Sequence, residues 1–96
     1  MWVLVTYDVN TETAAGRKRL RTVAQACKNY GQRVQKSVFE CTVNESQYER
    51  MRGRLIHIID EKEDSLRFYK MASSRDNTVE EFGTGHVIDF EGPLVV

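Results

Sequence analysis

Asp8 is a carboxylate at a position where it can contribute little to the packing of the chain. Asp8 lies near the end of the run WVLVTYDV at residues 2–9, whose apolar and β-branched side chains predict a central strand covered on both faces. A strand-end carboxylate suits Mg²⁺ or Mn²⁺, which takes one or two carboxylates together with waters and phosphates. One chain offers a single aspartate here, so two copies of Asp8 across a two-fold axis would make a more complete site.

Asp8 also has a structural interpretation. Aspartate is a favoured helix N-cap, because its side chain accepts a hydrogen bond from one of the first free amides of the helix. Asn10 and Thr11 lie closer to the start of the helix that we expect next, and they can serve as turn and cap residues instead. A metal ligand and a cap are therefore both open interpretations of Asp8.

The chain has a net charge of zero, but its charges are unevenly distributed. Residues 1–36 hold seven cations and two carboxylates, a net charge of +5, so the remainder holds −5. The seven cations are Arg17, Lys18, Arg19, Arg21, Lys28, Arg33 and Lys36. This asymmetry predicts a basic surface built by the first helix and the strand that follows it. A solvated helix face would account for the same pattern.

The other reactive side chains form no recognisable motif. The sequence lacks a Walker loop and the GxGxxG, HExxH and CxxC patterns. His57 and His86 have no partner at the spacing of metal ligands, and single histidines of this kind are more often structural. Cys27 lies on the apolar stripe of the first predicted helix and Cys41 in a predicted strand, so both fit small core residues. Two cysteines are too few for a disulfide scaffold. Reduced thiols predict a cytoplasmic protein.

Two amphipathic helices separate the predicted strands. The first follows Asn10 and Thr11 and ends before Gly31, which we expect just past the helix terminus. Its apolar stripe consists of Leu20, Val23, Ala24 and Cys27. The second begins at residues 44–46, where two candidate capping boxes overlap, Asn44 with Gln47 and Ser46 with Glu49. Its apolar stripe consists of Tyr48, Met51, Leu55, Ile58 and Ile59.

The predicted strands lie at residues 2–9, 32–43, 65–71 and 86–90. The second is longer than the usual 5–6 residues, so we expect a bend near Lys36 and Ser37 that gives two strands or one kinked strand. Residues 60–64 read as an acidic helix end and loop, and residues 72–85 as a polar loop. Pro93 confines the apolar tail after it to an edge or terminal strand.

This order predicts an α+β fold. A β-α-β-β-α-β chain forms a ferredoxin-like layer of two helices on an antiparallel sheet, here with an extra C-terminal strand. We expect one domain over residues 1–96, with the tail at residues 93–96 pairing with the partner subunit. Two helices cover one sheet face, so the apolar second face predicts a homodimer. No apolar run approaches the roughly 20 residues of a membrane helix, and no membrane association is predicted.

Three segments together resemble the CRISPR-associated endonuclease Cas-two family. They are Tyr7-Asp8-Val9, the basic segment GRKRLR at residues 16–21, and RVQKSVFEC at residues 33–41. The specific part is Tyr7-Asp8 combined with residues 33–39 at this separation. The resemblance covers nearly the whole chain, and the chain length agrees with it.

The resemblance implies a homodimeric endonuclease that acts in the acquisition of CRISPR spacers and cleaves DNA or RNA. Asp8 would be the catalytic ligand of Mg²⁺ or Mn²⁺, with Tyr7 as its neighbour. Nucleic-acid phosphates would be bound by Arg17, Arg19 and Arg33. The cleft of the dimer would be lined by Tyr7, Ser37 and Phe39. The resemblance also implies that the dimer bridges two dimers of the CRISPR integrase.

Two alternatives stay open on the sequence alone. The first is a non-catalytic scaffold of the integrase complex, in which Asp8 has a structural role. The second is a small regulatory or metabolite-binding ferredoxin-like domain, since fold alone does not determine function. The second alternative gives no reason for the basic segment or the strand-end aspartate, whereas only a measurement of activity separates the first from a nuclease.

Overall fold

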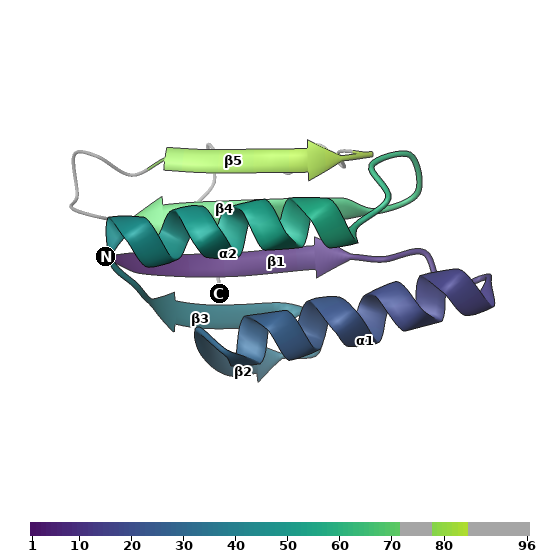
Figure 1. The fold of residues 1–96 in the computed structure, drawn as a ribbon, viewed down its shortest axis with the longest axis horizontal. Helices are drawn as coiled ribbons and strands as arrows, with labels where there is room; N and C mark the ends of the chain where they lie inside the picture. The colour runs from purple at the N-terminus through teal and green to yellow at the C-terminus, as the bar shows by residue number, and fades with distance from the viewer. Residues whose placement is uncertain (72–77, 85–96) are drawn as a thin grey trace.

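A computed structural model of the chain describes residues 1–71 and 78–84. The elements are β1 (Trp2–Asp8), α1 (Ala14–Lys28), β2 (Gly31–Gln35), β3 (Val38–Thr42), α2 (Glu45–Ile58), β4 (Ser65–Met71) and β5 (Thr78–Gly83). The strands form one sheet in the order β2-β3-β1-β4-β5, and all neighbours are antiparallel. Figure 1 shows both helices on the same face of this sheet. The predicted α+β fold, β-α-β-β-α-β with a further C-terminal strand, is confirmed.

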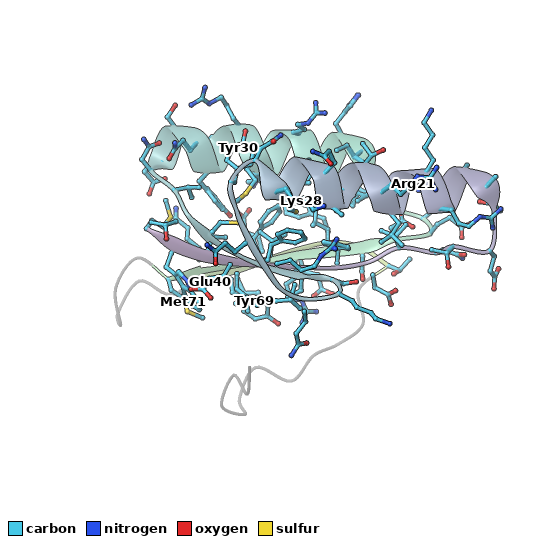
Figure 2. All side chains as sticks on the ribbon, turned by 90° about the horizontal axis from the view of Figure 1, so that it is seen from below. Arg21, Lys28, Tyr30, Glu40, Tyr69 and Met71 are labelled. Atoms are coloured by element: carbon cyan, nitrogen blue, oxygen red, sulfur yellow. The ribbon has the colours of Figure 1, made fainter. Side chains whose placement is uncertain are left out.

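The central strand β1 explains why its sequence is apolar on both faces. Side chains alternate between the two faces of a strand. Val3, Val5 and Tyr7 belong to the core beneath the helices, whereas Leu4 points to the opposite face and is also buried. Figure 2 shows Glu40, Tyr69 and Met71 on this second face, opposite the helices. Leu4 pairs with Glu40 and Tyr69, and Trp2 pairs with Met71, so these residues lie on one side of the sheet.

Both helices begin at residues that satisfy their first free amides. The Thr13 Oγ1 accepts a hydrogen bond from the Gly16 amide at 3.0 Å, so Thr13 caps α1. The prediction that Thr11 is the cap is wrong, because the helix starts two residues later than expected. Asn44 and Gln47 exchange hydrogen bonds of 2.8 and 2.9 Å in the capping box of α2. Of the two overlapping boxes, the structure forms this one.

The segment between the helices is a hairpin. Lys36 and Ser37 form the turn between β2 and β3, which confirms the predicted bend, and the pairing shifts by a bulge between Arg33 and Gln35. Gly31 opens β2, so the expectation that it closes the helix is wrong; the C-cap is Asn29. A Cβ at Gly31 would lie 2.7 Å from the Cys41 Sγ and would clash with the Glu40 carbonyl. Glycine therefore permits close pairing of the two strands.

The strand β5 corrects the prediction of a polar loop at residues 72–85. Glu80 and Phe82 lie on the same face of β5, toward the helices. Phe82 packs against the core, and Glu80 accepts hydrogen bonds from the Tyr48 hydroxyl at 2.6 Å and from the Arg52 Nε at 3.1 Å. Charged residues can hold an edge strand when their partners lie on the neighbouring elements, and the polar composition concealed this. The strand predicted at residues 86–90 and the tail at residues 93–96 lie outside the described residues.

The core fills the space between the sheet and the helices. Its largest fully buried side chains are Tyr48, Phe39, Phe68, Met51, Leu55 and Leu66. Most residues of the predicted helical stripes belong to it, with Leu20 and Ile58 at its margin. None of the helices in residues 1–71 and 78–84 is long and apolar enough to cross a bilayer.

Candidate active site

The end of β1 contributes to a small pocket on the second face of the sheet. This hollow, hereafter the Asp8 pocket, has a volume of about 240 Å³. Its polar lining residues include Thr6, Asp8, Ser37, Ser65, Arg67 and Glu81. Asp8 is exposed and pairs in register with Ser65, while Thr6 pairs with Arg67. Three strands and the β2–β3 turn thus bring polar side chains together beside the exposed Asp8 carboxylate.

The helix-cap interpretation of Asp8 is wrong. Thr13 caps α1, and the Asn10 Oδ1 accepts a hydrogen bond from the Glu12 amide at 2.9 Å in the preceding turn. The approach to the helix is therefore stabilised by residues after Asp8. Strand alternation also separates Asp8 from Tyr7, whose ring lies in the core on the helix side. The two adjacent residues serve different faces of the sheet.

The donors in the Asp8 pocket fit a hard cation in kind but not in number. Carboxylate oxygens are the preferred protein ligands of Mg²⁺. Glu81 lies in the same pocket, but its Oε1 is 2.6 Å from the Arg67 Nη2. Residues 1–71 and 78–84 contain no group of three or more His, Cys, Asp or Glu side chains that could hold a metal. Among the described residues, one chain thus brings the Asp8 carboxylate to such a site.

Arg67 is a residue of the Asp8 pocket that the sequence analysis missed. It is 4% exposed, although it lies on the second face, and its Nη1 donates to the Tyr69 hydroxyl at 3.3 Å. Burial lowers the pKa of this guanidinium, but the hydrogen bonds to Tyr69 and Glu81 outweigh burial and raise it. Arg67 therefore stays charged. An arginine in the middle of the apolar run SLRFYKM was the signal that could have identified it.

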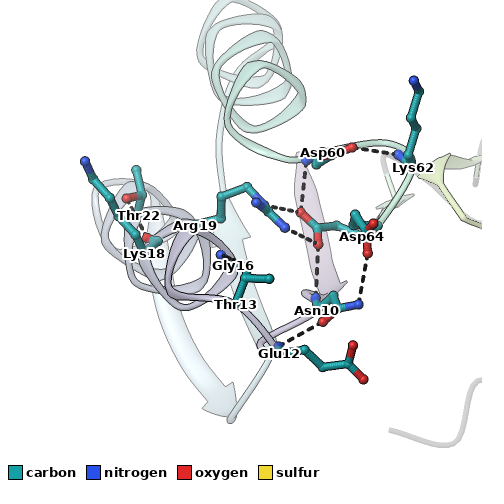
Figure 3. Close-up of polar contacts among 11 residues, drawn as sticks. Asn10, Glu12, Thr13, Gly16, Lys18, Arg19, Thr22, Asp60, Lys62 and Asp64 are labelled. Carbon is teal, nitrogen blue, oxygen red and sulfur yellow. Dashed lines mark hydrogen bonds and ion pairs between the residues drawn. The ribbon is translucent and has the colours of Figure 1, made fainter.

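Arg19 is held by a buried carboxylate, Asp64 (Figure 3). The Arg19 Nε and Nη2 donate to the two Asp64 oxygens at 2.8 and 3.3 Å. The amides of Asn10 and Asp60 donate to the same carboxylate at 3.0 and 2.9 Å. Burial would raise the pKa of Asp64, but Arg19 and the two amides more than offset it and lower the pKa. We call Arg19, Asp64, Asn10 and Asp60 the Asp64 cluster.

The other two predicted phosphate ligands are exposed. The Arg17 Nη1 donates to the Thr11 carbonyl at 3.1 Å, at the start of α1. The Arg33 guanidinium carbon lies 5.2 Å from the centroid of the Phe39 ring, which is fully buried. Phe39 therefore supports Arg33 from within the core and does not line the Asp8 pocket. The three predicted arginines come from different places and do not converge on one point.

Tyr7 and Ser37 connect the Asp8 pocket to a second hollow. The pocket and an open groove between α1 and β2 share both residues as lining. The Tyr7 hydroxyl donates to the Lys36 carbonyl at 3.4 Å, and the Tyr7 amide to the Ser37 carbonyl at 3.1 Å. Burial raises the pKa of the Tyr7 phenol, although its hydrogen bond with Arg33 opposes this. Tyr7 and Ser37 therefore lie where these two hollows meet, and their place in the cleft of a dimer stays a prediction.

The two cysteines lie in the core as expected. Both are free and fully buried. Burial raises the pKa of Cys27 to about 12 and that of Cys41 to about 11. Thiols with such pKa values are protonated at neutral pH and are poor nucleophiles. They offer no alternative to the chemistry of the Asp8 pocket.

These features agree with a known family. The family model described as "CRISPR associated protein Cas2" matches residues 1–79. The chain belongs to the Cas2 family. The matched residues include the whole first strand with Asp8, the hairpin with Ser37, and Arg67. The resemblance seen in the sequence is confirmed.

Relatives of the Cas2 family are similar over almost the whole chain. The "CRISPR-associated endoribonuclease Cas2 1" of Moorella thermoacetica is 57% identical over 96 residues, which is 100% of both chains. The "CRISPR-associated endonuclease Cas2" of Halalkalibacterium halodurans is 50% identical over 95 residues, 99% of each. The crystal structure of Streptococcus pyogenes Cas2 at pH 6.5 superposes with a TM-score of 0.70 at 62% identity, covering 77% of this chain and 89% of that one.

Proposed function

We propose that this Cas2 family chain is a metal-dependent endonuclease of CRISPR spacer acquisition, acting as a homodimer in the cytoplasm. The observation that carries the proposal is Asp8, an exposed carboxylate at the end of the central strand, in a polar pocket on the face opposite the helices. Two relatives are named endoribonuclease and endonuclease, which supports a nucleic-acid substrate, DNA or RNA. The buried free thiols are consistent with a reducing compartment.

Asp8 would hold Mg²⁺ or Mn²⁺ together with the same residue of a second chain. Two carboxylates close together repel each other, and a cation between them removes this repulsion. When bound, such an ion polarises a phosphate and makes a bound water more acidic. The Asp8 carboxylates would orient the site, and the buried Arg67 beside them would add positive charge where a phosphate enters.

The three arginines predicted from the resemblance would bind the phosphate backbone unequally. Arg17 and Arg33 are exposed, and Arg33 is supported by the Phe39 ring. Arg19 donates its Nε and Nη2 to Asp64, so its remaining nitrogen, Nη1, is left for a phosphate. We therefore expect Arg17 and Arg33 to contribute more to nucleic-acid binding than Arg19.

The homodimer would pair the second faces of two sheets. The residues Trp2, Leu4, Tyr69 and Met71 give this face apolar character in β1 and β4. A second copy would bring the partner subunit's Asp8 to the same region. We also propose that residues 1–96 form one domain whose tail, residues 93–96, adds to the partner's sheet.

Membership of the Cas2 family also supports a scaffolding role. In this role the dimer would bridge two dimers of the CRISPR integrase, and cleavage by Asp8 would not be required. The two functions use the same dimer and can coexist. A small regulatory or metabolite-binding domain is a poorer interpretation, because it accounts neither for the family nor for the Asp8 pocket.

The proposal is tested by Asp8→Asn, which keeps the size of the side chain and removes its charge. We expect Mg²⁺-dependent cleavage of single-stranded RNA and DNA to fall roughly 100-fold or more, as for loss of a metal ligand. Melting temperature should stay within error, because Asp8 is exposed and does not cap α1. Glu49→Gln, an equal charge change on the exposed side of α2, is the control. Wild-type cleavage by purified Asp8→Asn would overturn the proposal, whereas intact spacer acquisition by that variant would assign acquisition to the scaffold.

A further inference from the structure

A groove runs between α1 and the β2–β3 hairpin, on the other side of Tyr7 and Ser37 from Asp8. This α1–β2 groove is open and has a volume of about 850 Å³. Leu20 and Ala24 of α1, together with the partly exposed Val34 of β2, give it an apolar floor. Figure 2 shows Arg21 and Lys28 at two positions along α1.

Four cations line the α1–β2 groove, and no carboxylate does among the described lining residues. Arg21 and Lys28 come from the helix, and Arg33 and Lys36 from the hairpin. None of these four takes part in an ion pair among residues 1–71 and 78–84, whereas Arg19, Arg52, Arg67 and Lys70 do. The groove is therefore complementary to an anion with several charges.

The spacing of these cations favours an extended anionic chain over a single phosphate. Arg21 and Lys28 are seven residues apart, so their backbones lie roughly 10 Å apart along the helix axis. Arg33 is held over the Phe39 ring and loses less freedom when it binds a ligand than an unsupported side chain would. Phosphates following one another along a strand would meet both walls, while sugars would contact the apolar floor.

The size of the α1–β2 groove favours one strand. A volume of about 850 Å³ falls within the range of small-molecule pockets, roughly 300–1,000 Å³, which is enough for a short stretch of one strand. The shared lining residues Tyr7 and Ser37 place the end of the groove beside the Asp8 pocket. A strand that leaves the groove at the hairpin turn arrives at Asp8.

We propose that the α1–β2 groove binds a single strand of nucleic acid by its phosphates and leads it into the Asp8 pocket. This inference rests on the proposed nuclease function and assigns to it a substrate-binding groove outside the Asp8 pocket. It assigns phosphate binding to Arg21, Lys28 and Lys36 in addition to Arg33. A duplex would have to open before its strand reaches Asp8.

The test is the double variant Arg21→Gln/Lys28→Gln, compared with Arg50→Gln/Arg54→Gln. The second pair removes the same charge from exposed positions of α2 outside the α1–β2 groove. The probes are oligo-dT and oligo-U of about 12 nucleotides, within the span of single-strand sites. Affinity is measured against salt by fluorescence anisotropy, cleavage kinetics are measured with Mg²⁺, and melting temperature confirms the fold.

The groove variant should bind both probes roughly tenfold less tightly at low salt, the scale expected for two exposed ion pairs. The slope of log K against log salt should fall by about 1.4, since each phosphate contact to a single strand contributes about 0.7. KM should rise with kcat unchanged, because the groove binds substrate and transition state alike. The control pair should leave slope and KM near wild type.

Three results would overturn the inference: an unchanged slope in the groove variant, an equal loss in the control pair, or a KM effect confined to duplex substrates. A fourth would be loss of poly-glutamate binding in the groove variant with no loss of oligonucleotide binding, since that would assign the α1–β2 groove to acidic peptides. Asp8→Asn separates this inference from the proposed function. If Asp8→Asn still cleaves while the salt dependence of binding falls in the groove variant, the nuclease assignment of Asp8 fails. Strand binding by the α1–β2 groove is then still supported.

Discussion

Two aspartates near the same end of the sheet have opposite environments. Asp64 has no exposed surface, and its carboxylate accepts hydrogen bonds from Arg19 and from the amides of Asn10 and Asp60. Asp8 pairs in register with Ser65, the residue after Asp64, yet it is exposed in an open pocket. The two carboxylates are close in the fold and differ in what surrounds them.

The difference separates a buried structural carboxylate, Asp64, from one that solvent reaches, Asp8. A buried charge is tolerated only when paired and hydrogen-bonded, and the Asp64 cluster meets that requirement by joining the start of α1 to the start of β4. Asp8 is exposed, so water can hydrate its charge and the cost of burying a charge does not arise. Removing the charge of Asp64 should therefore damage the fold, whereas removing that of Asp8 should damage chemistry.

The largest expected effect on stability is that of Asp64→Asn. Asparagine keeps one oxygen, so its NH2 group replaces the acceptor either of the Arg19 Nη2 and the Asn10 amide or of the Arg19 Nε and the Asp60 amide. One donor from Arg19 and one backbone amide therefore lose their acceptor. We expect a loss of about 3 kcal/mol in the free energy of unfolding, as for a broken buried ion pair. Urea denaturation measures it, with Glu61→Gln as the control because Glu61 is exposed on the same loop. A loss below about 1 kcal/mol would show that the cluster contributes little.

The pH dependence of stability sharpens the same comparison. The pKa of Asp64 is lower in the folded chain than its ordinary value of 3.8. Its contribution is therefore fully present above that value and is lost as pH falls through the folded pKa. Glu80 adds a similar term, because the hydrogen bond from Arg52 lowers its pKa. The free energy of unfolding, measured from about pH 5 to pH 2, should fall less steeply with decreasing pH in Asp64→Asn than in the wild type. Equal slopes of the two variants would contradict this.

A smaller effect is expected for Arg67→Met on the second face. Methionine keeps apolar volume but leaves Glu81 without its partner; the Glu81 side chain is 30% exposed and partly hydrated. We expect a loss of about 1–2 kcal/mol, below that of Asp64→Asn, with a smaller loss for Glu81→Gln. A double-mutant cycle of the two positions measures their coupling. Additive effects would mean that the 2.6 Å ion pair contributes nothing of its own.

Most of the fold was predictable because it depends on periodicity. The helical stripe Tyr48, Met51 and Leu55, the bend at Lys36 and Ser37, and the strand at residues 65–71 are local patterns that packing did not override. The strand β5 was missed because its sequence, TVEEFG, has low apolar content. Its position depends on partners distant in sequence, such as Tyr48 and Arg52 for Glu80.

In the candidate site, the position of Asp8 was predictable from the sequence, whereas the residues around it were less so. Asp8 follows from one strand and its end, with no need for tertiary knowledge. The capture of Arg19 by Asp64, 45 positions away, could not be read from an acidic run that looked like a solvated loop. The same limit hid Arg67, whose partner lies on β5, and the convergence of Arg21, Lys28, Arg33 and Lys36 on one groove.

The most direct test of the central claim is the binding of Mn²⁺ to the wild type, Asp8→Asn and Asp64→Asn by calorimetric titration. The claim is that Asp8 serves a metal shared by two chains while Asp64 serves the fold. It predicts one Mn²⁺ per two wild-type chains, no measurable binding to Asp8→Asn, and retained binding by Asp64→Asn at a temperature where that variant is folded. Undiminished binding of Mn²⁺ by a folded Asp8→Asn would contradict the claim.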